Sequence, residues 1–133
     1  MRQVGFELRP WEDSGTELVP LVNGVSLIEL VARYERNEGL KPADGYAGLV
    51  LYGDLPSGLR AYLTGGPGTP YALLGCDCGD MGCWPLAAQI HADADTVTWD
   101  SFRQPHRPEW DYSGFGPFTF DRAQYDEALQ LLN

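Results

Sequence analysis

Three cysteines within eight residues are the strongest chemical signal in this sequence. The segment Cys76-Asp77-Cys78-Gly79-Asp80-Met81-Gly82-Cys83 holds every cysteine of the chain. Its two glycines allow the backbone to fold back, so that the three sulfurs can converge. Three thiolates and one histidine form a recognised tetrahedral zinc site. One interpretation of this segment is therefore a structural zinc site at Cys76, Cys78 and Cys83.

The fourth ligand of such a site does not follow from spacing. The paired C-x-x-C pattern of common zinc fingers is absent. His91 and His106 are the only histidines, so a Cys3His site must recruit one of them. Asp77 and Asp80 are weaker ligands beside three thiolates. Both histidines therefore remain candidate metal ligands.

The same cysteines are equally consistent with a turn that holds no metal. In that interpretation they are reduced residues between two strands, and the glycines serve backbone geometry alone. The odd count argues against a framework made only of disulfides. Redox or nucleophilic use is a third interpretation, which Asp77 and Asp80 oppose because nearby negative charge disfavours a thiolate.

A second concentration of functional residue types lies at residues 102–115, a proline- and glycine-rich segment that predicts a loop. A cleft built there is a candidate small-molecule site. Its predicted ligand-binding residues are Trp99, His106, Trp110, Asp111 and Tyr112. The alternative is a loop that folds down as a lid and completes the core.

These residues also allow a catalytic interpretation. His106 can serve as a general base oriented by a nearby acid, or it can activate a cysteine as a nucleophile. Both arrangements require side chains from distant segments to meet.

These residues must be positioned by the surrounding helices and strands. The periodicity of the sequence predicts an α+β fold, with a mostly antiparallel sheet of about six strands and two helices. Candidate strands lie near residues 4–9, 18–22, 47–53, 59–63, 71–75, 84–91 and 96–102. One helix is predicted at residues 26–37, begun by a capping box of Ser26 and Glu29, with Glu35 on its solvated face. The other is predicted at residues 121–132, with Asp121 as its cap and Gln124 at its third position.

Charge narrows the choice of partners. Nineteen acidic and nine basic residues give a net charge of −10, without a basic run. This balance repels nucleic acids and anionic membranes, and it leaves a protein or a small molecule as the expected partner. The N-terminus is charged and lacks the apolar segment of a signal peptide, so we expect a cytoplasmic protein. The length of the chain predicts that residues 1–133 form one domain.

Several segments of the C-terminal half resemble a known group of proteins. These segments are residues 74–83, 97–99 and 116–121 together with Tyr125. They are similar to small uncharacterised bacterial proteins, many of them actinobacterial. The resemblance implies a bacterial cytoplasmic protein and transfers no catalytic residue.

Two functions follow as hypotheses. The first is a noncatalytic binding or interaction module, with or without a structural zinc at the cysteine loop. The second is a small enzyme that uses loop 102–115, with His106 and an acid or a cysteine.

Overall fold

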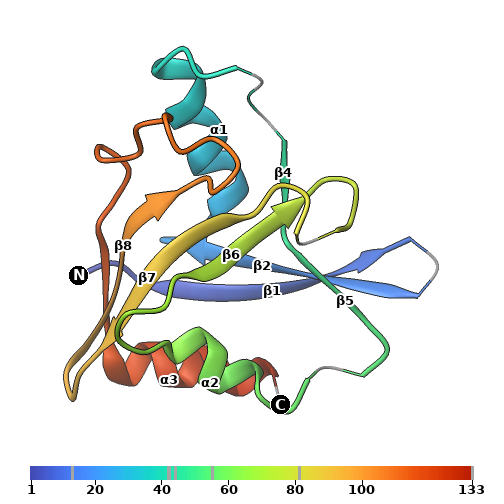
Figure 1. The fold of residues 1–133 in the computed structure, drawn as a ribbon. Coiled ribbons are helices and arrows are strands. Elements are labelled where there is room, and N and C mark those ends of the chain that lie inside the picture. Colours follow the sequence, from blue (N-terminus) through green and yellow to red (C-terminus); the bar gives the residue numbers. More distant parts are fainter. Residues whose placement is uncertain (13, 42, 44, 55, 81, 133) are drawn as a thin grey trace.

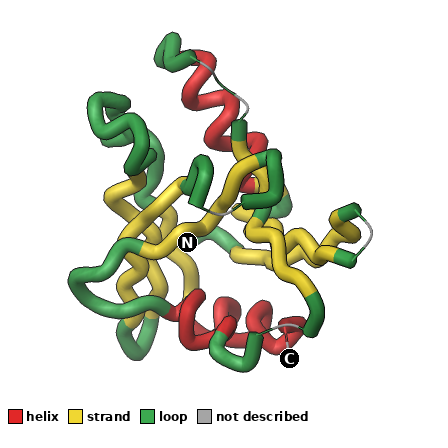
Figure 2. The backbone as a smooth tube through the Cα atoms, turned by 45° about the vertical axis from the view of Figure 1, so that its right-hand side comes forward, coloured by secondary structure: helices red, strands yellow, loops and turns green. Residues whose placement is uncertain are grey.

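A computed structural model describes residues 1–12, 14–41, 43, 45–54, 56–80 and 82–132. Within these residues the chain is α+β, with three α-helices and two antiparallel sheets (Figure 1, Figure 2). The predicted fold class is confirmed, although the described residues form nine strands rather than about six, and these divide between two sheets. No helix in the described ranges is long and apolar enough to cross a membrane.

The first sheet is built on a long hairpin. Strand β1 (Val4–Trp11) pairs with β2 (Gly15–Val22), which also pairs with β3 (Val25–Ser26) and β5 (Leu49–Tyr52). Pro10 does not end β1 and lies opposite Thr16 in the pairing. β1 is an edge strand of its sheet. Proline, which has no N–H to donate, is tolerated there at a position whose backbone nitrogen faces away from the neighbouring strand.

The second sheet carries the segments singled out for chemistry. Its strands are β4 (Tyr46–Ala47), β6 (Tyr71–Cys76), β7 (Leu86–Ala92), β8 (Thr96–Arg103) and β9 (Phe118–Asp121), in that spatial order. The cysteine segment joins β6 to β7, and loop 104–117 joins β8 to β9. Both connections leave the same sheet.

The predicted strand at residues 47–53 divides between the two sheets at Gly48. A Cβ atom on Gly48 would lie 2.4 Å from the Leu18 carbonyl oxygen, so only glycine allows this approach of the two backbones. The Gly48 amide donates to Oε2 of the buried Glu17 at 2.7 Å. The chain thus leaves β4 in one sheet and enters β5 in the other.

Both predicted helices form where their caps indicated. Helix α1 (Leu27–Asn37) begins after Ser26, whose Oγ accepts a hydrogen bond from the Ile28 amide at 3.1 Å. Helix α3 (Arg122–Leu129) begins after Asp121, which accepts from the Gln124 amide, and continues into the 3-10 turn η1 (Gln130–Leu132). In Figure 1, α1 lies at one end of the sheets and α3 at the other.

The strand predicted at residues 59–63 is wrong, because this segment forms helix α2 (Leu59–Thr64). Leu59 and Leu63 are four residues apart and both are buried, which is the spacing of one helical face. An apolar run this short is consistent with both the two-residue period of a strand and the 3.6-residue period of a helix. Packing of the leucines against the sheet favours the helix.

The core at the α2–α3 end is aromatic. Trp99 and Tyr125 are fully buried, and the Trp99 indole donates to the Tyr125 hydroxyl at 3.1 Å. That hydroxyl donates in turn to the Leu63 carbonyl oxygen at 2.5 Å. These bonds tie β8, α3 and α2 together.

Candidate metal centre

The three cysteines converge in the connection between β6 and β7. The Sγ atoms of Cys76, Cys78 and Cys83 all lie within 4.8 Å of one another. In the part of the chain that the structure describes, this is the one group of three or more histidine, cysteine or acidic residues placed to hold a metal ion. The cysteine loop, residues 76–83, lies beside β4 at the upper right of Figure 1.

Short-range hydrogen bonds explain why the sulfurs meet. The Gly79 amide donates to the Cys76 carbonyl oxygen at 3.0 Å, and Gly79 has a φ of 91°, which suits glycine. In the second half of the loop, the Gly82 amide donates to Asp80 Oδ1 at 2.9 Å and the Cys83 amide to the Asp80 carbonyl oxygen at 3.2 Å. The loop therefore contains two consecutive turns, and Met81 lies outside the described residues.

The cysteines differ in exposure and in acidity. Cys76 is buried, whereas Cys78 and Cys83 are exposed. Burial raises the pKa of Cys76 to about 12, and hydrogen bonding to the other two thiols adds to this rise. The pKa of Cys78 is lowered, first by its hydrogen bond with the Cys76 thiol and then by the Asp80 backbone.

The predicted effect of acidic charge is present at Cys78 but does not decide the direction of its pKa shift. The negative charge of Asp80 raises the pKa of Cys78, but the hydrogen bonds outweigh it. An exposed carboxylate is screened by water, whereas a hydrogen bond acts directly on the sulfur.

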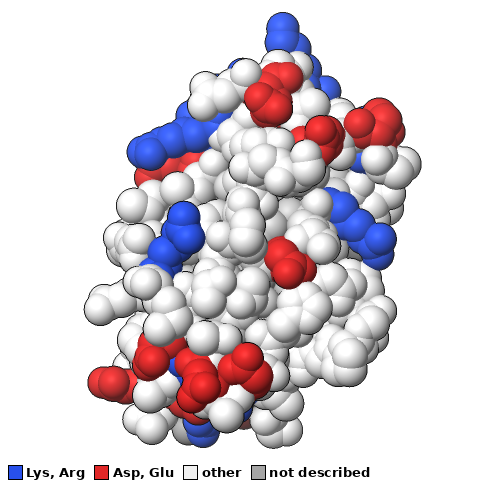
Figure 3. Space-filling model, turned by 90° about the vertical axis from the view of Figure 1, so that its left-hand side faces the viewer, with Lys and Arg blue, Asp and Glu red and all other residues white. Residues whose placement is uncertain are grey.

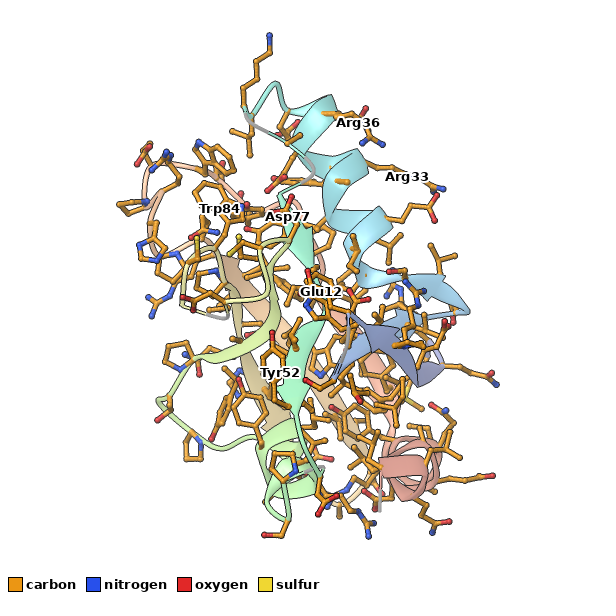
Figure 4. The ribbon with its side chains drawn as sticks, turned by 90° about the vertical axis from the view of Figure 1, so that its right-hand side faces the viewer. Glu12, Arg33, Arg36, Tyr52, Asp77 and Trp84 are labelled. Atoms are coloured by element: carbon orange, nitrogen blue, oxygen red, sulfur yellow. The ribbon has the colours of Figure 1, made fainter. Side chains whose placement is uncertain are left out.

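Tryptophan side chains lie at the loop and just after it. Trp11, the last residue of β1, packs against Gly79, where an added Cβ atom would lie 3.2 Å from the Trp11 Nε1 atom. Trp84 follows the loop and packs edge-to-face on Trp110, with ring centres 5.6 Å apart. Figure 4 shows Trp84 and Asp77 on one face of the molecule, together with the exposed Glu12.

The two histidines lie in different places. The His106 Nε2 atom is 2.9 Å from the carbonyl oxygen of Gly82, the residue that precedes Cys83. His91 lies near the far end of β7, with its Nε2 atom 3.1 Å from Asp100 Oδ1. The structure thus brings His106 to the cysteine loop and leaves His91 paired with a carboxylate elsewhere on the sheet.

Loop 104–117 folds down over the core. Trp99 has no exposed surface, packs against Phe120 and Tyr125, and therefore cannot line a ligand cleft in this structure. Trp110 contacts Trp84 instead, and the Tyr112 ring is buried. The predicted cleft of Trp99, Trp110 and Tyr112 does not form, because the first of these rings belongs to the core of the α2–α3 end.

Asp111 takes a local role in this loop. Its Oδ1 accepts a hydrogen bond from the Ser113 amide at 2.8 Å. Hydrogen bonds from the side chain and backbone of Ser113 lower the pKa of Asp111. Its carboxylate therefore stabilises a turn of the loop.

A buried polar network that was not predicted from the sequence lies beneath the loop. Tyr112 donates to Oε2 of the fully buried Glu35 at 2.5 Å and lies 3.1 Å from the Tyr46 hydroxyl. The amide of Gln104, also fully buried, donates to Tyr46 at 3.0 Å. The placement of Glu35 on the solvated helix face was wrong, and its spacing of four residues from Val31 was the available signal.

Comparisons of the chain with protein-family models, with curated proteins and with solved structures found no match.

Proposed function

We propose that the protein is a noncatalytic binding module whose cysteine loop holds a zinc ion. The convergence of the Cys76, Cys78 and Cys83 sulfurs within 4.8 Å carries this proposal. Ligand sulfurs around a zinc ion bonded at about 2.3 Å are separated by roughly 3.7 Å, so a small contraction of the loop suffices.

The chemistry of the donor set supports zinc. Thiolates are soft ligands that select zinc or copper(I) over magnesium and calcium. A dipositive ion would replace the thiol protons, including that of Cys76, whose pKa burial raises to about 12. Binding should therefore release protons and weaken as the pH falls.

Charge around the loop favours a cation as well. Asp77 and Asp80 lie within it and are both exposed, and the whole chain carries a charge of −10. Figure 3 shows acidic and basic side chains interspersed on another face, with one group of acidic side chains at its lower end. We expect the partner of the module to be a protein or a small molecule rather than a nucleic acid or a membrane.

Elemental analysis tests the metal. Protein purified without chelators should contain close to one equivalent of zinc, and each of the Cys76→Ser, Cys78→Ser and Cys83→Ser variants should lose most of it. Ser101→Ala, a change at an exposed position of β8, is the control and should retain the metal. Less than about a tenth of an equivalent in the wild-type protein, after reduction and incubation with zinc, would refute the proposal.

A further inference from the structure

One contact holds His106 against the cysteine loop, and a second fixes its backbone within loop 104–117. Its Nε2 atom lies 2.9 Å from the Gly82 carbonyl oxygen, and its backbone amide donates to Gln104 Oε1 at 3.0 Å. A carbonyl oxygen only accepts hydrogen bonds, so Nε2 carries the proton. The Nδ1 atom then holds the lone pair that a metal ion requires, on the ring edge opposite the Gly82 contact, so the ring must turn to present it to the sulfurs.

Through Gln104, the second contact connects His106 to β4, the strand that pairs with the beginning of the cysteine loop. Gln104 is fully buried, and its Nε2 atom donates to the Tyr46 hydroxyl at 3.0 Å. Tyr46 lies opposite Cys76 in the pairing of β4 with β6. His106 therefore contacts the cysteine loop directly at Gly82, next to Cys83, and its backbone is fixed by Gln104, which bonds to the β4 residue opposite Cys76.

The competing fourth ligands fit less well, two by position and one by chemistry. His91 lies near the far end of β7 and pairs with Asp100. Asp80 Oδ1 accepts the Gly82 amide and shapes the second turn of the loop. Asp77 Oδ1 is 3.6 Å from the Cys76 sulfur, but a carboxylate is a harder ligand than imidazole beside three thiolates.

We propose that His106 supplies the fourth ligand, so that a bound zinc ion joins the cysteine loop to loop 104–117. This inference rests on the proposed zinc site. His106 does not belong to the group whose ligand atoms lie within 4.8 Å of one another, so metal binding must draw its exposed ring and the cysteine loop together. The zinc ion then links the two connections directly: the cysteine loop, which precedes Trp84, and loop 104–117, which contains Trp110.

X-ray absorption spectroscopy of the zinc-loaded protein tests the ligand set. The wild-type spectrum should fit three sulfurs at about 2.3 Å and one imidazole nitrogen at about 2.0–2.1 Å. The His106→Gln variant keeps an amide that can donate to the Gly82 carbonyl, but it removes the imidazole. It should lose the imidazole scattering and bind zinc at least about tenfold more weakly.

The matched control is His91→Gln, the same substitution at the other histidine. It should reproduce the wild-type spectrum and zinc affinity. Hydrogen exchange in residues 104–117 should slow on zinc addition in the wild-type protein and in His91→Gln, but not in His106→Gln. Equal melting temperatures of the metal-free proteins will show that the substitutions leave the fold intact.

Each outcome is decisive. An unchanged spectrum and affinity in His106→Gln would overturn the role of His106 and leave the three-thiolate site standing. A wild-type protein that binds no zinc would overturn both proposals. Loss of imidazole scattering in His91→Gln alone would show that His91 is the ligand and would refute the zinc link between the cysteine loop and loop 104–117.

Discussion

Cys76, Cys78 and Cys83 are chemically unequal although their sulfurs are neighbours. The buried Cys76 holds its proton, with a pKa of about 12, while hydrogen bonds lower the pKa of the exposed Cys78. In the metal-free protein this arrangement places thiolate on Cys78 rather than on Cys76.

Thiol modification should follow this order, because the thiolate is the reactive species. We expect iodoacetamide to modify Cys78 first and Cys76 last in the metal-free protein near neutral pH. Mass spectrometry of timed digests measures the order. Unfolded protein, in which the three thiols lose their environments, is the control, and preferential modification of Cys76 in the folded protein would contradict the prediction.

Tyr112 and Glu35 form the most buried polar contact near the site. The Tyr112 hydroxyl donates to the Glu35 carboxylate, and Glu35 has no exposed surface. Tyr112→Phe removes this donor from a buried carboxylate and should lower the free energy of unfolding by about 1–3 kcal/mol. Denaturant titration measures the change.

Tyr52→Phe is the control for this substitution. Tyr52 is 61% exposed, so the loss of its hydroxyl should change the free energy of unfolding by less than about 0.5 kcal/mol. Equal effects of the two substitutions would show that the buried network contributes nothing particular to stability.

At the scale of elements, close backbone packing fixes how α2 meets β7. Gly65 ends α2 with a φ of 75°, and a Cβ atom there would lie 2.4 Å from the Ile90 Cβ atom. Only a residue without a side chain allows this contact.

Gly65→Ala should therefore destabilise the protein more than Gly68→Ala. Gly68 also has a positive φ, 81°, but open space around it, so only the first variant adds a clash, and the ψ of −163° at Gly65 is a conformation essentially restricted to glycine. We expect the free energies of unfolding to differ by about 1–3 kcal/mol, the usual effect of overpacking. Thermal or denaturant unfolding of the pair measures it, and equal values would mean that β7 moves aside.

At the scale of the whole molecule, buried phenols bind the elements together. Tyr46 and Tyr112 join β4 to loop 104–117, and Tyr125 joins α3 to α2 and β8. Burial is the largest cause of the raised pKa of each of these tyrosines.

These raised pKa values predict loss of stability at alkaline pH. Unfolded tyrosines ionise near pH ~10, while the folded protein keeps these three protonated. Their contribution is complete below that pH and is lost as the pH rises toward the folded pKa values, by up to about 1.4 kcal/mol per pH unit for each buried phenol. Melting temperatures between pH 8 and 11.5 should fall steeply in the upper part of this range, and a flat profile would contradict the prediction.

Much of the local structure was predictable because its signals are local. Ser26 and Asp121 predicted the two helix starts, since a cap acts on amides two or three residues away. The spacing of Cys76, Cys78 and Cys83 likewise indicated that their sulfurs could meet, since two turns within eight residues leave the loop few alternatives.

The tertiary structure decided what depends on distant partners. The segment at residues 59–63 is a helix because its leucines bury against the sheet, and Gly48 divides a predicted strand because β2 passes within van der Waals contact. Trp99 enters the core rather than a cleft, and Glu35 finds Tyr112 across 77 positions of sequence. The choice between His91 and His106 is of the same kind. Sequence determined that three thiols lie together, and only the packing of loop 104–117 brought one histidine to them, because side-chain contacts between remote segments depend on the whole fold.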